Sequence, residues 1–149
     1  MKVELLHLRD VQAASKLIIE LNKIQGKDKV KDDAESILVD LLIKCIDTPT
    51  FKFWIVKDSK GVVVGGAMCH FIYLPHLVKD RRLLVEGIYV KNENLNNPGK
   101  YLFAAIDKFC KENNIHYVIG ECYDNLSRSN KYWKMLGAEA IGTLYRREV

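Results

Sequence analysis

The chain has 149 residues, of which 48% are hydrophobic and 28% charged, with a formal net charge of +4 and a pI near 8.8. This length and composition indicate one soluble globular domain, residues 1–149, that can bury a core of its own. No apolar run approaches the roughly 20 residues that span a bilayer, so we expect no membrane partner. The mild basicity falls short of a nucleic-acid-binding domain, and we expect no nucleic-acid partner either.

The cysteines are widely separated, form no C-x-x-C pair and stand among apolar residues; they are Cys45, Cys69, Cys110 and Cys122. The N-terminal residues alternate polar and apolar and have no signal-peptide core. These features predict buried, reduced thiols in a cytoplasmic protein, in preference to disulfides or a metal. No zinc spacing, Ser-His-Asp grouping or Walker-type loop is present, so no metal site is expected.

The first half predicts a strand over residues 2–9, then a helix over 11–24 with Asp10 as its N-cap. A second helix is expected over 33–46, and Thr48-Pro49 ends it. Aromatic and β-branched residues predict a strand over 51–57, a hairpin turn over 58–61 and a returning strand over 62–73. Gly65-Gly66 indicates a bulge or a close backbone approach in that strand. The second helix is expected to bury a stripe made of Ile37, Leu38, Leu41, Leu42 and Cys45.

The second half begins with a loop over residues 74–82 and a strand over 83–90. An Asn-rich loop over 91–97 leads into a helix over 99–113, followed by a strand over 116–123. A helix over 125–136 with Gly137 as its C-cap and a strand over 140–147 complete the chain. The order β-α-α-β-β-β-α-β-α-β predicts an α/β (α+β) fold, a mixed sheet with helices on both faces.

The strand, loop and helix between residues 83 and 110 are the best place for a phosphate. The first turn of a helix has unpaired N–H groups and carries partial positive charge. An ordinary connection between a strand and a helix is the alternative explanation of this stretch.

The chain resembles the GNAT superfamily of acyl-CoA-dependent N-acyltransferases. Residues 85–90, Val-Glu-Gly-Ile-Tyr-Val, resemble the family's fourth strand, and residues 125–138 resemble its last helix, with Asn125 and Tyr132 seven positions apart. The resemblance implies a mostly antiparallel central sheet and acetyl-CoA as co-substrate, with no metal. The residues that it implies for CoA binding are Ile88, Tyr89, Val90, Asn97, Gly99, Lys100, Tyr101, Asn125 and Trp133.

The chain departs from the family pattern in two places. The pyrophosphate loop lacks its leading Arg or Gln, Asn97 stands where the first Gly is usual, and Pro98 has no N–H to donate. Because Asn tolerates left-handed backbone angles, Asn96 or Asn97 can still make the turn, and Lys100 can restore positive charge. In the last helix, counting from Asn125 selects Tyr132 and counting back from Gly137 selects Trp133. We favour Tyr132, with Trp133 packed against CoA.

Acyl transfer from a thioester to an amine needs a base, an oxyanion donor and an acid for the thiolate. The resemblance implies Glu86 as base, directly or through water, the N–H of Val90 as oxyanion donor, and Tyr132 as acid. Purely structural roles are the alternatives for Glu86 and Tyr132. A structural role is favoured for the two strand histidines, His70 and His116, and His76 has no distinctive spacing.

The resulting hypothesis is an N-acetyltransferase that moves an acetyl group from acetyl-CoA to a primary amine of a small molecule, peptide or protein. A catalytically degenerate GNAT-fold binding or regulatory protein is the alternative, and a nucleic-acid-associated protein is a weaker third. The amine acceptor has no motif in the sequence. The oligomeric state is open, a homodimer included.

Overall fold

The computed structural model of the chain describes residues 1–24, 32–72, 81–91, 97–120, 131 and 133–140. Five strands form one sheet in the order β1-β2-β3-β4-β5, in which the first four pair antiparallel and β5 runs parallel to β4. The mostly antiparallel sheet confirms the predicted fold class. The strands are β1 (Lys2–Leu5), β2 (Phe51–Lys57), β3 (Val63–Ile72), β4 (Arg82–Val90) and β5 (Tyr117–Gly120).

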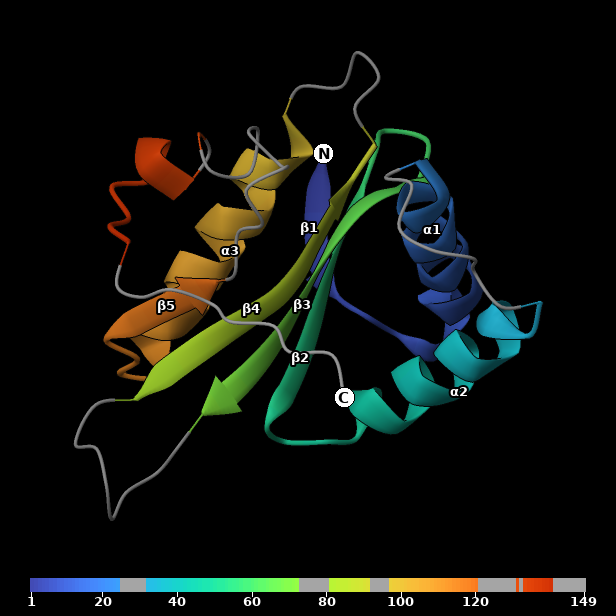
Figure 1. Cartoon of the computed structure of the whole chain (residues 1–149), viewed down its shortest axis with the longest axis horizontal. Helices are drawn as coiled ribbons and strands as arrows, with labels where there is room; N and C mark the ends of the chain where they lie inside the picture. Colours follow the sequence, from blue (N-terminus) through green and yellow to red (C-terminus); the bar gives the residue numbers. More distant parts are fainter. Residues whose placement is uncertain (25–31, 73–80, 92–96, 121–130, 132, 141–149) are drawn as a thin grey trace, which may run out of the picture.

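Helices cover both faces of the sheet (Figure 1). The helices α1 (Val11–Ile24) and α2 (Ala34–Ile46) pack on one face, in a core that includes Ile18, Leu42 and Phe53. The helix α3 (Pro98–Glu112) packs on the other, in a core that includes Leu83 and Ile106. This arrangement confirms the predicted helices on both faces.

The first strand is shorter than predicted. It ends at Leu5, and a 3₁₀ helix, η1 (Leu8–Asp10), follows before α1. At the end of η1, the Asp10 carboxylate lies 2.8 Å from Lys57 Nζ on β2. Asp10 thus lies directly before the helix, as expected, and its carboxylate contacts the sheet.

The apolar stripe predicted for α2 is too wide. Leu42 is fully buried and Leu38 is half-buried, but Ile37 and Leu41 are 50% and 47% exposed. Residues 38, 42 and 45 lie on one row of the helix, and residues 37 and 41 lie about 100° away from it. Only the first row meets β2 and α1.

The paired glycines of β3 confirm the predicted close approach. A Cβ on Gly66 would lie 2.7 Å from the Phe53 ring, and one on Gly65 would lie 3.2 Å from Tyr89 O and 3.5 Å from Pro98 Cβ. The pairing of β2 with β3 also shifts at Val64, which is the extra residue of a bulge. The missing side chain of Gly65 lets the beginning of α3 lie close to β3 and β4.

Candidate active site

A β-bulge in β4 sets the direction of the candidate catalytic carboxylate. Met68 pairs with Gly87 and the next residue of β3, Cys69, pairs with Val85, so Glu86 is the extra residue. A bulge resets the alternation of side chains along a strand. Consequently Val85 and Ile88 both pack toward α3, whereas Tyr89 packs toward α1 and α2.

Glu86 meets His70 on the face that α1 and α2 cover. His70 Nδ1 and Glu86 Oε1 are 2.6 Å apart, and the two side chains are 43% and 33% exposed. The ring of Phe51 contacts the imidazole edge-on, with 4.8 Å between the ring centroids. The pair is therefore held in place on β3 and β4 but remains open to a ligand.

The pair lies next to thiol and phenol groups that stay neutral. Burial, and secondly the Glu86 carboxylate, raise the pKa of Tyr89 on β4. The same two causes raise the pKa of Cys45 on α2. Near neutral pH the Tyr89 phenol and the Cys45 thiol are therefore uncharged.

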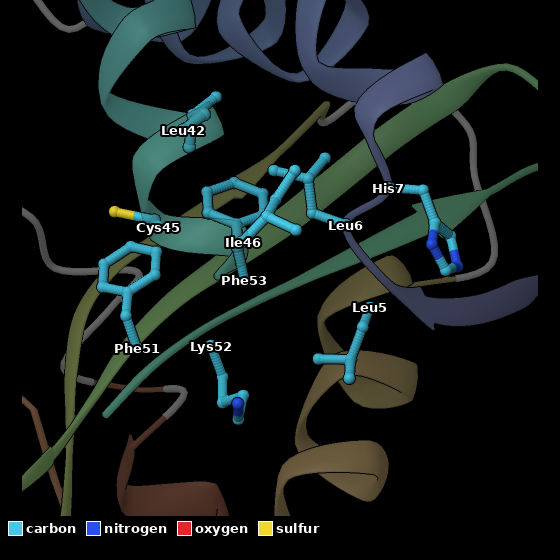
Figure 2. A pocket seen from close by; sticks show the side chains of 9 residues that line it. All are labelled: Leu5, Leu6, His7, Leu42, Cys45, Ile46, Phe51, Lys52 and Phe53. Carbon is cyan, nitrogen blue, oxygen red and sulfur yellow. The ribbon is translucent and has the colours of Figure 1, made fainter. Parts of the chain in front are cut away.

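A pocket of about 210 Å³, lined mostly by apolar residues, lies on the Phe51 side of the pair. Figure 2 shows its walls, which come from the end of β1, the end of α2 and the start of β2. Phe51 belongs to both the pocket wall and the His70 contact, so the pocket and the pair are neighbours. The lining residues are Leu5, Leu6, His7, Leu42, Cys45, Ile46, Phe51, Lys52 and Phe53.

The two parallel strands pair over only part of β4. Arg82 to Val85 pair with Tyr117 to Gly120, and no described strand pairs with that side of β4 beyond Val85. In Figure 1, β4 continues past the end of β5 toward the beginning of α3. Backbone groups of Ile88, Tyr89 and Val90, which the resemblance implies for acyl-CoA binding, lie on this unpaired half of the strand.

Of the two asparagines predicted for the turn into α3, Asn97 makes a left-handed turn, and Asn96 lies outside the described residues. The φ and ψ of Asn97 are 44° and 72°, in the left-handed region, and its backbone O and Oδ1 both accept from Lys100 N, at 3.0 and 3.4 Å. Pro98 has no N–H, so within the described residues Gly99 and Tyr101 are left with first-turn N–H groups that have no acceptor. Two N–H donors at a helix N-terminus suit an anion.

Lys100 and Tyr101 lie on the outer side of that first turn. Both are exposed, Tyr101 by 40%, and among the described residues no carboxylate pairs with the Lys100 ammonium. Gly99 is buried beneath them. A cation beside the Gly99 and Tyr101 donors adds to the suitability of this turn for phosphate groups.

Trp133 packs into the protein core. Its ring lies edge-on to Phe103 of α3, with 5.2 Å between centroids, and against Gly120 at the end of β5. Gly137, with φ of 77°, ends the helical turn as predicted: Gly137 N donates to Lys134 O and Ala138 N to Trp133 O. The other residues implied in this region, Asn125 and Tyr132, lie outside the described residues.

The contact that sequence reasoning missed is the one between His70 and Glu86. A structural role was favoured for His70, and His76, the histidine of the loop before β4, lies outside the described residues. The two partners are on adjacent strands, so an alignment of 62–73 with 83–90 places them close only if the bulge at Glu86 is included. A carboxylate next to Gly87 in a strand was the available signal, since glycine in a strand often marks a bulge.

Two kinds of feature are absent from the residues that the structure describes. No group of His, Cys, Asp and Glu suited to a metal ion is present among the residues that the structure describes. None of the described helices is long and apolar enough to cross a membrane.

No protein-family model matches the chain, and no curated protein sequence matches it either. Solved structures resemble it over its whole length. The tetramutant of the BH1408 protein from Bacillus halodurans has a TM-score of 0.85 at 12% identity, with 100% of both chains covered. Ribosomal-protein-alanine N-acetyltransferase from Brucella melitensis biovar Abortus 2308 has a TM-score of 0.77 at 17% identity, also with 100% of both chains covered.

A third similar structure is a complex with CoA. Aminoglycoside N-acetyltransferase AAC(6′)-Iy, in complex with CoA, has a TM-score of 0.79 at 16% identity and covers 99% of this chain and 93% of its own. The chain therefore has the GNAT fold, which the sequence resemblance predicted. At these identities the likeness establishes the fold.

Proposed function

We propose that the protein is an N-acetyltransferase that moves an acetyl group from acetyl-CoA to a primary amine by direct attack. The observation that carries the proposal is the position of Glu86. Its carboxylate lies at the bulge of β4 beside His70, next to the half of β4 that β5 leaves unpaired. Named N-acetyltransferases with this fold, one of them in complex with CoA, support the same reaction class.

In this proposal the CoA pyrophosphate lies at the first turn of α3. The N–H groups of Gly99 and Tyr101 donate to it, and Lys100 adds charge, while Asn97 shapes the turn. The pantetheine arm follows the unpaired backbone of Ile88, Tyr89 and Val90, with the Val90 N–H as oxyanion donor. Asn125 and Tyr132 keep the roles that the resemblance implies, with Tyr132 as the acid for the thiolate.

Glu86 provides the base in this scheme. A primary amine is protonated near neutral pH and must lose a proton before it can attack the thioester carbonyl. The apolar pocket beside Phe51 suits an acceptor whose amine is attached to an apolar group. Buried, unpaired Cys69 and Cys110 support the cytoplasmic location that the sequence favours, since reducing compartments keep thiols free.

The test is release of CoA thiol when the protein is mixed with acetyl-CoA and a panel of primary amines. We expect turnover that falls roughly 10²-fold or more in Glu86→Gln and Tyr132→Phe. The matched controls are Glu112→Gln, an exposed residue of α3, and Tyr117→Phe, an exposed residue of β5. Unchanged turnover in both site variants would remove these two assignments.

The degenerate binding protein remains the second candidate because Pro98 removes one phosphate donor from the turn. Calorimetry with acetyl-CoA separates the two candidates. Binding together with turnover supports the enzyme. Absence of heat at near-millimolar acetyl-CoA supports a protein that has lost the cofactor.

A further inference from the structure

We infer that His70 Nε2, oriented by Glu86, is the atom that takes the proton from the acceptor amine. This inference rests on the proposed function and refines it: Glu86 acts through His70, whose Nε2 is the atom that accepts the proton. An ionised carboxylate has only acceptor oxygens, so the 2.6 Å contact with Nδ1 requires the proton of a neutral imidazole to be on Nδ1. The lone pair is then on Nε2.

The surroundings of the imidazole leave Nε2 accessible. Phe51 contacts the ring from β2 and Glu86 holds Nδ1 from β4. His70 is 43% exposed, and its only polar partner within the described part of the chain is Glu86. The contact with Glu86 therefore occupies Nδ1 and leaves Nε2 without a polar partner among the described residues.

Three other titratable groups described near this face, those of Tyr89, Cys45 and Glu20, do not compete for the proton. Tyr89 from β4 and Cys45 from α2 are neutral near pH 7, because burial raises the pKa of both. Glu20 of α1 is paired with Lys91 beyond the far end of β4, at 2.8 Å. Glu86 is the one carboxylate in contact with the imidazole among the described residues, and it stabilises the imidazolium when this forms.

The reaction balances without a further reactant. Nε2 takes a proton from the ammonium group of the acceptor, and the amine lone pair forms a C–N bond to the acetyl carbonyl carbon. The C–S bond breaks and its electron pair leaves with the CoA sulfur. Sulfur takes up the second proton that the nitrogen loses, and the imidazolium returns its proton to solvent.

The experiment compares His70→Gln and Glu86→Gln by the pH profile of kcat/KM, whose acid limb reports the essential base of the free enzyme. We expect kcat/KM of His70→Gln to fall roughly 10²–10⁴-fold and its pH profile to lose the acid limb. The affinity for acetyl-CoA should be unchanged. Glu86→Gln keeps an oxygen that accepts from Nδ1, so it should retain the acid limb, and its loss of kcat/KM should not exceed that of His70→Gln. The control is His116→Gln, which removes an imidazole just before β5.

A second readout does not depend on turnover. The ¹⁵N NMR shifts of His70 should show the Nδ1–H form in the wild-type protein. Three results would each overturn the inference. The first is activity of His70→Gln within twofold of wild type, and the second is an acid limb that disappears in Glu86→Gln but persists in His70→Gln. The third is an imidazole whose proton is on Nε2. Absence of turnover with every amine, with the Nδ1–H form intact, would instead overturn the proposed function and the base role that rests on it.

Discussion

The indole ring of Trp133 lies over the α-carbon of Gly120, so that a Cβ at residue 120 would be 2.8 Å from Cη2 and closer still to Cζ2. Such contacts are shorter than carbon atoms tolerate. Gly120 ends β5, and Phe103 of α3 holds the other side of the indole. The helical turn at residues 133–135 is thus attached to the sheet through a ring that only glycine accommodates.

We expect Gly120→Ala to reduce the free energy of unfolding by about 1–3 kcal/mol, because the added methyl group displaces the indole. Urea unfolding followed by circular dichroism measures the change. The control is the same substitution in a Trp133→Leu background, where the smaller side chain leaves room for the methyl group. Equal destabilisation in the two backgrounds would show that the Trp133 contact is not the cause.

At the start of α3, we expect glycine and alanine substitutions of Asn97 to differ in stability and in acetyl-CoA affinity. Asn97→Gly keeps the left-handed backbone and should cost only a few tenths of a kcal/mol, whereas Asn97→Ala should cost about 1–2 kcal/mol. Since the turn positions the Gly99 and Tyr101 donors, acetyl-CoA affinity should fall in Asn97→Ala and persist in Asn97→Gly. Unfolding curves and calorimetry give the two quantities.

Asn114 provides the matched control for that prediction. It follows the other end of α3 and is also left-handed, with φ of 52°. Asn114→Ala should therefore destabilise the protein by a similar amount without a change in acetyl-CoA affinity. If both alanine variants weaken binding equally, the effect is one of general stability and the role of Asn97 at the phosphate site is lost.

The ion-pair cluster at β1 and β2 predicts a loss of stability in acid. Hydrogen bonds from Lys2 and then Lys57, both 2.7 Å from the carboxylate, lower the pKa of Glu4 from 4.5 to about 2. Because the folded-state pKa is below the unfolded one, the stabilisation is present above pH 4.5 and disappears as the pH falls toward 2. Unfolding curves across that range measure it.

Removal of either lysine separates their contributions to this acid sensitivity. In both Lys2→Met and Lys57→Met the pKa of Glu4, read from the carboxyl shift by NMR, should rise. The effect of Lys2, which is 74% exposed, should weaken in 1 M salt, whereas that of Lys57, at 14%, should persist. A Glu4 pKa that is the same in both variants and the wild type would contradict the assignment. Lys57 Nζ also contacts the Asp10 carboxylate, so Lys57→Met should in addition destabilise the beginning of α1.

Thiol accessibility tests the buried cysteines. Burial, and secondly the Asp107 charge, raise the pKa of Cys110 to about 11, and burial raises the pKa of Cys69 still more strongly. At pH 8 both should therefore resist alkylation by iodoacetamide in the native state and react after unfolding in urea, since the thiolate is the nucleophile. Half-buried Cys45 should react first of the three described thiols. Peptide mass spectrometry assigns the sites, and early modification of Cys69 would contradict the described packing.

Much of the fold follows from patterns within short segments. The apolar repeat of 11–24, the β-branched run of 51–57 and the close approach at Gly65-Gly66 all appear as predicted. A left-handed asparagine at residue 96 or 97 and the C-cap at Gly137 were predicted as well, because these conformations depend on the residue itself and its immediate neighbours. The width of the buried stripe on α2 was wrong, because burial depends on which elements cover the helix.

The candidate site needed the tertiary structure. Glu86 and Val90 were selected through the family resemblance of their strand. The partner of Glu86 depends on the register between β3 and β4, and the bulge that sets this register is a property of the two strands together. The point at which β5 stops pairing with β4 and the contact between Trp133 and Gly120 likewise depend on residues that are distant in sequence. Local residue preferences determined the elements of this protein, whereas packing between the elements decided which side chains meet.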